Sequence, residues 1–281
     1  MFQKKNLIPM AICYDFDGTL SPGNMQEYGF IKKLGIAPED FWKESNQFAK
    51  NHQMDGILAY MKMVIDKSKE NHLPFRRQDF QSYGKTVQLY PGVEKWFRQI
   101  SAYALKKGIQ LDHYIISSGM KEMIEGTKIA RCFKEIFASS FLYDENGVAV
   151  WPAVALNYTT KTQFLFRINK GCLDLADDKS INRFIPLDKR ALPFEQMIYI
   201  GDGETDIPCM RMVKDMGGYS VAVYKDDVAK KTADRLVYDK RVNLAAVADY
   251  SKGQQIDLFV RAVIDKIQSD HALEKEIQKG K

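Results

Sequence analysis

Two pairs of aspartates, each placed where a buried strand is expected to end, are the residues of this chain best suited to chemistry. Asp15 and Asp17 follow one apolar run, and Asp202 and Asp206 follow another. Short apolar runs are typical of strands inside a parallel sheet, and such sheets bind ligands at the carboxyl ends of their strands. Carboxylates gathered at one edge repel one another. A hard cation would relieve this repulsion, and Mg²⁺ suits a site of few carboxylates, phosphate and water.

A serine and glycine turn offers an anion site that would complement the carboxylates. Ser117, Ser118 and Gly119 follow a third apolar run at 111–116, and a helix is expected after them over 120–131. Backbone N–H groups at such a turn point at a ligand, and the helix dipole favours negative charge there. We therefore expect this turn to bind an anion beside the aspartates.

Lys161 is the candidate cation of the site. It falls in the first turn of a helix expected to run toward Lys170, with Thr159 or Thr160 as the N-cap residue. A cation at this end opposes the helix dipole, so a nearby anion would explain its position. Lys170 at the other end of the helix remains the alternative. An aspartate held between a metal and an anion site is suited to act as a nucleophile toward phosphorus.

The overall composition describes the protein that must position these residues. The 281 residues are 45% hydrophobic and 27% charged with a net charge of +5, which is typical of a globular protein. Basic residues are scattered, so nucleic-acid binding is not expected. The four cysteines lack the spacing of a zinc site or a disulfide framework. No stretch has the length of a membrane span and no signal peptide is evident, so a cytoplasmic protein without a membrane partner is expected.

The chain between the first two apolar runs is expected to form helices without strands. Turns at Ser21–Gly23 and near Tyr90–Gly92 bound this block, and either turn could serve as a hinge. The block is too small to bury a large core alone, so it is predicted to be a lid packed on a larger domain. The predicted division is a helical cap over 21–89 and a catalytic core over 1–20 and 90–281.

The second half of the chain alternates strand and helix signals. A hairpin is expected over 141–156 with Asn146 and Gly147 at its tip. The later elements are expected to be a strand at 197–200, a helix at 207–215, a strand at 220–224, a short strand at 236–238 and a helix at 254–268. These elements predict an α/β fold with a Rossmann-like three-layer core, a mostly parallel central sheet and an inserted helical cap. Asp206 has a second interpretation, as the cap of the helix that follows it.

Four motifs, in their order along the chain, resemble those of the haloacid dehalogenase-like hydrolase superfamily. They are DFDGT at Asp15–Thr19, ISSG at Ile116–Gly119, Lys161, and GDGETD at Gly201–Asp206. The helical insertion between the first two is similar to the type 1 cap of that superfamily. The arrangement most resembles the branch that contains phosphoserine phosphatases.

The resemblance implies a Mg²⁺-dependent phosphatase that hydrolyses a small phosphomonoester through an aspartyl-phosphate. Asp15 would be the nucleophile, and Asp17 would be the general acid and then the general base. Asp202, together with Asp15 and the main-chain carbonyl of Asp17, would bind Mg²⁺. Asp206 would support Asp202 or a metal-bound water.

The resemblance also implies how the phosphoryl group is held. Ser117 and Lys161 would bind it, with N–H groups from Ser118 and Gly119, and Lys161 would balance the charge of Asp15. The same fold also supports phosphotransferases and mutases, and a non-catalytic module that binds a phosphorylated ligand is a third alternative. The oligomeric state is left open.

One departure from the phosphoserine phosphatase pattern concerns the substrate. Members of that branch usually carry a glutamate nine residues after the nucleophile, where it contacts the amino group of serine phosphate. This position holds Asn24 here, and the nearest glutamate is Glu27. The identity of the phosphorylated substrate is therefore open, and Asn24, Glu27, Arg76 and Arg77 are the candidate contacts to its leaving group.

Overall fold

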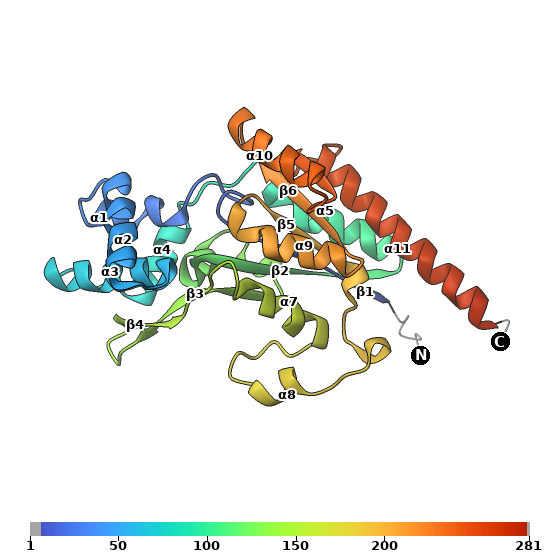
Figure 1. Cartoon of the computed structure of the whole chain (residues 1–281), viewed down its shortest axis with the longest axis horizontal. Coiled ribbons are helices and arrows are strands. Elements are labelled where there is room, and N and C mark those ends of the chain that lie inside the picture. The colour runs from blue at the N-terminus through green and yellow to red at the C-terminus, as the bar shows by residue number, and fades with distance from the viewer. Residues whose placement is uncertain (1–6, 280–281) are drawn as a thin grey trace.

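The structure is a computed structural model that describes residues 7–279, and a seven-stranded sheet forms its centre (Figure 1). The strand order is β4-β3-β2-β1-β5-β6-β7, and all neighbours are parallel except β3 and β4. The strands are β1 (Ile8–Tyr14), β2 (Ile109–Met120), β3 (Glu135–Tyr143), β4 (Ala149–Val154), β5 (Met197–Gly201), β6 (Tyr219–Tyr224) and β7 (Leu244–Val247). The predicted α/β class and mostly parallel sheet are confirmed.

Helices cover both faces of the sheet and complete the three layers. One apolar core includes residues of α5 (Val93–Lys106), α6 (Lys121–Gly126) and α11 (Gln255–Lys279). A second core, on the opposite face, includes residues of α7 (Lys161–Lys170), α9 (Ile207–Asp215) and α10 (Asp227–Tyr238). Burial on both faces explains why β1 and β5 read as nearly unbroken apolar runs.

The strand order changes direction at β1, which has later strands on both of its sides. From β1 it adds β2 and β3 on one side, and it later returns to add β5, β6 and β7 on the other side. In open α/β sheets the ligand crevice lies at this reversal, outside the carboxyl ends of the strands. The backbone N–H of Asp15 donates to the carbonyl of Ile200 at 2.9 Å, which holds the ends of β1 and β5 together.

The helices between β1 and α5 gather at one end of the molecule (Figure 1). They are η1 (Met25–Tyr28), α1 (Phe30–Lys33), α2 (Pro38–His52), α3 (Gly56–Glu70) and α4 (Arg77–Gly84). Aromatic side chains pack them, and Phe80 of α4 stacks on Phe141 of β3 with ring centroids 5.7 Å apart. The helical insertion thus shares a core with the β3–β4 hairpin. The cap boundaries stay a prediction, and residues 1–6 and 280–281 of the predicted core lie outside the described residues.

Two predicted elements were wrong. Residues 236–238 belong to α10 and not to a strand, because the Asp226 side chain caps the start of α10 and Leu236 packs against the sheet at helical spacing from Ala233. The last strand, β7, comes later. The helix expected over 120–131 ends at Gly126, where the backbone of α6 closely approaches Gln81 of α4, and a short 3₁₀ turn, η2 (Ala130–Cys132), follows.

The remaining elements agree with expectation or extend it. The hairpin is formed by β3 and β4, and α11 continues to Lys279, beyond the predicted end of that helix. The segment between α7 and β5 holds α8 (Asp178–Asn182), η3 (Leu187–Lys189) and η4 (Phe194–Gln196), and η5 (Glu204–Asp206) precedes α9. All four cysteines are free. Within residues 7–279, no helix combines the length and apolar character needed to cross a membrane.

Candidate active site

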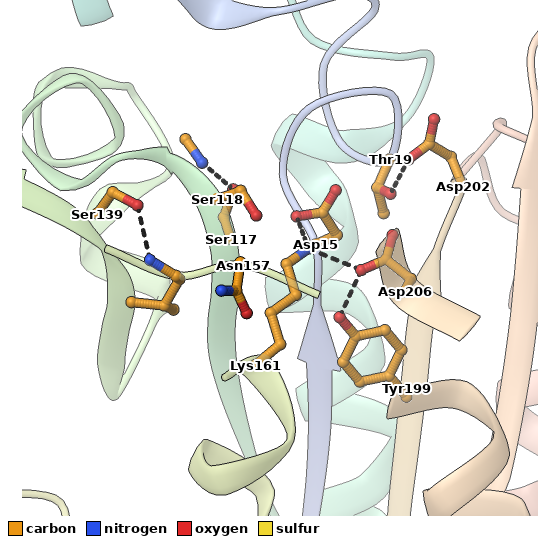
Figure 2. A network of polar contacts seen from close by, with 12 residues as sticks. Asp15, Thr19, Ser117, Ser118, Ser139, Asn157, Lys161, Tyr199, Asp202 and Asp206 are labelled. Carbon is orange, nitrogen blue, oxygen red and sulfur yellow. Dashed lines mark hydrogen bonds and ion pairs between the residues drawn. The ribbon is translucent and has the colours of Figure 1, made fainter. Parts of the chain in front are cut away.

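The strand ends bring the predicted site residues together (Figure 2). Asp15 directly follows β1, Asp202 and Asp206 follow β5, and Lys161 is the first residue of α7. The Lys161 ammonium donates to Asp15 Oδ1 at 2.9 Å and to Asp206 Oδ1 at 2.7 Å. The lysine thus bridges the carboxylates of two strand ends.

Lys161 is fully buried between these partners. Burial lowers its pKa, but the neighbouring Asp15 and Asp206 carboxylates outweigh this and raise the pKa above its ordinary value, so the ammonium stays charged. Its unfavourable place in the first turn of a helix is explained by these two anions. The alternative candidate, Lys170, is engaged elsewhere. Its ammonium donates to the backbone carbonyls of Ile181 and Arg183, near the end of α8.

The turn that starts α7 depends on a residue that the sequence did not single out. The Asn157 side-chain oxygen accepts from the N–H groups of Thr159 and Thr160, at 3.0 and 2.9 Å. Thr160 occupies the N-cap position of α7, as predicted, but its side chain makes no capping hydrogen bond. The Asn157 amide nitrogen in turn donates to Asp55, at the start of α3, at 2.8 Å. Asn157 therefore links the position of Lys161 to the helical insertion.

Asp202 is held close to the first strand by a glycine. Gly18 has φ +73°, and a Cβ atom there would overlap the Asp202 carboxylate. Thr19 Oγ1 also lies 3.5 Å from Asp202 Oδ1. Burial, followed by the charges of Asp15 and Asp206, raises the pKa of Asp202 to about 8. The site therefore carries more negative charge than Lys161 alone balances.

Asp206 points into the site and does not cap α9. Its side chain makes no capping hydrogen bond, because Oδ1 accepts from Lys161 and, at 2.7 Å, from the Tyr199 hydroxyl. The capping interpretation was wrong. Tyr199 is a further residue that the sequence did not reveal, since within β5 it reads only as a buried aromatic. Its hydroxyl fixes the orientation of a carboxylate that is fully buried.

Asp17 lies on the other side of Asp15, toward the helical insertion. Its Oδ1 accepts from the backbone N–H of Met25 at 2.8 Å. Its Oδ2 lies 2.9 Å from where a Cβ on residue 119 would be, so Gly119 leaves the room that this carboxylate occupies. Burial, followed by the charge of Asp15, raises the pKa of Asp17 well above its usual range. A raised pKa suits a carboxyl group to the role of a general acid.

Ser117, Ser118 and Gly119 lie beside Asp17, but they belong to the irregular end of β2 and not to a turn after it, because the register of β2 with β3 shifts between Ser117 and Met120. Ser117 is buried and its Oγ accepts from the backbone N–H of Gly119 at 3.0 Å. The carbonyl of Ser118 accepts from the Tyr60 hydroxyl of α3 at 3.1 Å. The Ser118 hydroxyl is buried and has no hydrogen-bond partner among the residues that the structure describes. Phosphate binding by Ser117, Ser118 and Gly119 stays a prediction.

Three carboxylates lie close enough together to bind one divalent cation. One oxygen each from Asp15, Asp202 and Asp206 lie within 4.8 Å of one another. Within residues 7–279, Asp206 Oδ2 is buried without a hydrogen-bond partner. Burial and the Asp206 charge raise the pKa of Asp15 to about 6, which again reflects excess negative charge. These oxygens are the donors that Mg²⁺ prefers, so the residues fit such an ion. Asp17 does not belong to this group of three.

A cavity of about 590 Å³ opens between these residues and the helical insertion. Among the predicted site residues, Asp15, Asp17, Ser117, Ser118, Gly119, Lys161 and Asp202 line it. Of the candidate contacts to a leaving group, Asn24 lines the cavity, but Glu27, Arg76 and Arg77 do not. Arg76 instead donates to the carbonyl of Asn146, and Arg77 lies over the Tyr143 ring. The structure therefore places these three candidates outside the cavity.

The geometry agrees with a comparison of the sequence with protein families. Residues 12–211 match the haloacid dehalogenase-like hydrolase model, and this range includes all of the site residues described above. The chain belongs to the haloacid dehalogenase-like hydrolase family. This hydrolase is also 27% identical over 289 residues to an uncharacterized protein of Borreliella burgdorferi, covering 91% of this chain and 96% of the relative.

Solved structures share the fold of this hydrolase. A HAD-family hydrolase from Salmonella enterica serovar Typhi is 14% identical, with a TM-score of 0.59 over 93% of this chain and 73% of that chain. A substrate-bound phosphoserine phosphatase is 13% identical, with a TM-score of 0.56 over 86% of this chain and 94% of that chain. At such low identity, these likenesses extend to the fold alone.

Proposed function

We propose that this hydrolase is a Mg²⁺-dependent phosphatase that cleaves a small phosphomonoester through an aspartyl-phosphate on Asp15. The observation that carries the proposal is the ion-paired Asp15 carboxylate at the end of β1. Lys161 contacts it at 2.9 Å, and Asp202 and Asp206 complete a group of carboxylates within 4.8 Å. Family membership and this arrangement together support acyl-phosphate chemistry at Asp15.

The first step transfers the phosphoryl group to the enzyme. A carboxylate oxygen of Asp15 forms a bond to phosphorus while the bond from phosphorus to the alcohol oxygen breaks. Asp17, with its raised pKa, gives its proton to the departing oxygen, so the product leaves as a neutral alcohol. Lys161 and the Ser117–Gly119 segment surround the phosphoryl oxygens and stabilise their negative charge.

The second step regenerates the carboxylate. Asp17, now ionised, takes a proton from a water molecule whose oxygen attacks phosphorus. The bond between phosphorus and Asp15 breaks, inorganic phosphate leaves, and both aspartates return to their starting states. Bound Mg²⁺ would supply charge neutralisation for the phosphoryl oxygens, with Asp15 and Asp202 as its carboxylate ligands and Asp206 beside them.

Hydrolysis of p-nitrophenyl phosphate with and without Mg²⁺ tests the proposal. We expect turnover that chelation with EDTA abolishes, and Asp15→Asn should reduce kcat by at least about a thousandfold because the amide is a poor nucleophile. Asp270→Asn, at an exposed ion pair of α11, is the matched control and should retain the activity. Activity retained by Asp15→Asn would contradict the proposed mechanism.

Two alternatives are distinguished by the same assay. Transfer of the phosphoryl group to an added alcohol, in excess of inorganic phosphate release, would indicate a phosphotransferase. Binding of phosphate esters without any turnover would indicate a ligand-binding module. The presence of both a buried nucleophile candidate and a carboxyl group with a raised pKa favours hydrolysis over binding alone.

A further inference from the structure

The part of the cavity wall that the 21–89 block contributes is uncharged. Among the described residues, those of the 21–89 block that line the cavity include no lysine, arginine, histidine, aspartate or glutamate. Its polar lining consists of amides and hydroxyls, together with two aromatic rings: Asn24, Gln26, Ser45, Asn46, Trp42 and Tyr60. The leaving group of a bound phosphate ester would meet these side chains.

Glu27, the acid that follows the lining residue Gln26 in the sequence, is engaged elsewhere. The Glu27 carboxylate accepts hydrogen bonds from Asn24 Nδ2 at 3.0 Å and from Trp42 Nε1 at 3.2 Å, and Glu27 does not line the cavity. It orients two lining residues instead of contacting a ligand. Beyond the catalytic residues, Glu204 and Lys225 line the cavity from the core side, but both are exposed, so water screens their charges.

Gln26 is a lining residue adjacent in sequence to the contact that holds Asp17. It follows Met25, whose backbone N–H holds the Asp17 carboxylate at 2.8 Å. Gln26 is only 4% exposed, and its Oε1 is buried without a hydrogen-bond partner in the part of the chain that the structure describes. A buried amide oxygen without a partner is unfavourable, and a substrate hydroxyl that donates to it would remove this cost.

We propose that the leaving group is an uncharged alcohol with several hydroxyls, a sugar or polyol, and that Gln26 selects it beside Asp17. This inference rests on the proposed phosphatase function and specifies its substrate class. Amides both donate and accept hydrogen bonds, as hydroxyls do, so the two are complementary. The Trp42 and Tyr60 rings offer apolar surface to the carbon skeleton. An ammonium or carboxylate on the leaving group would lose its hydration here without gaining a buried partner of opposite charge.

Specificity constants for a set of phosphate esters test the inference. The set is glucose 6-phosphate and glycerol 3-phosphate against O-phosphoserine, phosphoethanolamine and phosphocholine, with p-nitrophenyl phosphate as the reference. We expect at least one hydroxylated ester to exceed every charged one by tenfold or more in kcat/KM. A preference for phosphocholine would indicate that the two rings bind a cation, and it would overturn the inference, as would a preference for either amino ester.

Failure of the inference can be told apart from failure of the proposed function. Without hydrolysis of p-nitrophenyl phosphate, the proposed function itself fails. If that ester is hydrolysed and a charged ester is preferred, the phosphatase function stands and only the substrate class is wrong. If p-nitrophenyl phosphate is hydrolysed and no other ester is, the cavity does not select a polyol and the inference is also wrong.

Variants of Gln26 test its assigned role. Gln26→Leu should lower the ratio of kcat/KM for the preferred hydroxylated ester to that for p-nitrophenyl phosphate by about tenfold. Gln26→Glu should raise the relative kcat/KM for phosphoethanolamine by introducing a carboxylate. Gln47→Leu on α2 is the matched control, because that side chain bonds Asn51 outside the cavity. Ratios unchanged from the control in folded Gln26 variants, as checked by circular dichroism, would overturn the role.

Discussion

Gly18 shows how a single residue without a side chain can set the geometry of the carboxylates. Its φ of +73° lies in the left-handed region, and the Asp202 carboxylate occupies the space that a Cβ would need. Gly108, directly before β2, has φ +76° with no atom within 4 Å of the corresponding Cβ position. Comparing substitutions at the two glycines therefore distinguishes the effect of backbone strain from the effect of crowding against Asp202.

We expect Gly18→Ala to impair activity and Gly108→Ala, which lies outside the cavity, to preserve it. Both variants carry the strain of an alanine in the left-handed region, roughly 1–2 kcal/mol of unfolding free energy. Only Gly18→Ala must also displace Asp202, which should weaken Mg²⁺ activation and reduce kcat/KM on p-nitrophenyl phosphate by tenfold or more. Urea unfolding and Mg²⁺ titration of activity measure the two effects. Equal activity in the two variants would show that Asp202 tolerates the displacement.

The site residues differ in how well a local sequence pattern predicts their role. Asp15, Asp17 and Asp202 stand at strand ends beside glycines, a local pattern that predicts a ligand edge. Tyr199 reads only as a buried aromatic of β5, and the contact from Asn157 to Asp55 joins residues far apart in the sequence, so neither contact was predictable. Asn157 could have been suspected as a cap, because a side-chain amide commonly accepts from N–H groups two and three residues later.

Helix α3 connects the insertion to both proposed phosphate-binding segments. At its start, Asp55 Oδ2 accepts from Asn157, which orders the turn before Lys161. One turn further on, the Tyr60 hydroxyl donates to the carbonyl of Ser118. Because α3 contacts both the turn before Lys161 and the Ser118 carbonyl, a movement of α3 would change the positions of both segments. An insertion that closes over a site can couple its closure to the order of the catalytic groups.

Asp55→Asn tests this connection without removing the helix cap. Asp55 Oδ1 accepts from the N–H groups of Ile57 and Leu58, and asparagine is an equally good N-cap residue. The new amide would, however, present a donor to the donating nitrogen of Asn157. We expect kcat/KM on p-nitrophenyl phosphate to fall about tenfold, since a hydrogen bond to a charged group contributes about 1.5–3 kcal/mol.

The matched control for this variant is Asp177→Asn. Asp177 caps α8 in the same way, through the N–H groups of Lys179 and Ser180, and lies away from the cavity. Melting temperatures of the two variants should be similar. If Asp55→Asn matches the control in kcat/KM as well, the contact between α3 and Asn157 has no part in catalysis.

Elements with long, periodic patterns were predictable, and those decided by neighbours were not. The strands β1 and β5 and the helices α5 and α9 follow from buried apolar runs and helical spacing alone. Residues 236–238 show the opposite case, because the capping Asp226 and the sheet beneath Leu236 override a short apolar run that resembles a strand. The early end of α6 depends on contact with α4, which no local sequence contains.

On the scale of the whole molecule, the segments that join insertion and core are tied together. The N–H of Tyr90 donates to the carbonyl of Leu20 at 2.9 Å, and the Tyr250 hydroxyl donates to the carbonyl of Thr19 at 3.0 Å. A Cβ on Gly92 would overlap the backbone of Ser251, whereas Gly23 has free space. Of the two hinges expected from the sequence, the one near Gly23 is therefore the better placed for movement.

A buried histidine in β2, the strand that pairs with β1, makes the global stability depend on pH. His113 is 4% exposed, and its ring bonds the Tyr14 hydroxyl at 3.0 Å and the Ser101 hydroxyl at 2.9 Å. Burial lowers the pKa of His113 from 6.5 to about 3, so the folded protein keeps the ring neutral where the unfolded chain binds a proton.

The sign of the effect follows from proton binding. Below pH 6.5 the unfolded chain binds more protons than the folded protein at this residue, so its contribution is fully present above pH 6.5 and is lost as the pH falls toward 3. Between pH 7.5 and 5.0 the loss from this residue should be about 2 kcal/mol of unfolding free energy. The acidic cluster titrates over part of the same range, with the opposite sign for its raised pKa values, so comparison with a variant is needed.

We expect His113→Gln to lose this part of the pH dependence. The variant will be less stable at pH 7.5, since the ring and its two hydrogen bonds are gone, but its unfolding free energy should fall by about 2 kcal/mol less on acidification than that of the wild type. His52→Gln changes an exposed histidine of α2 and should retain the wild-type pH dependence. Urea unfolding at the two pH values measures all three proteins. The same acid-induced loss in His113→Gln and the wild type would mean that His113 is not the group responsible for it.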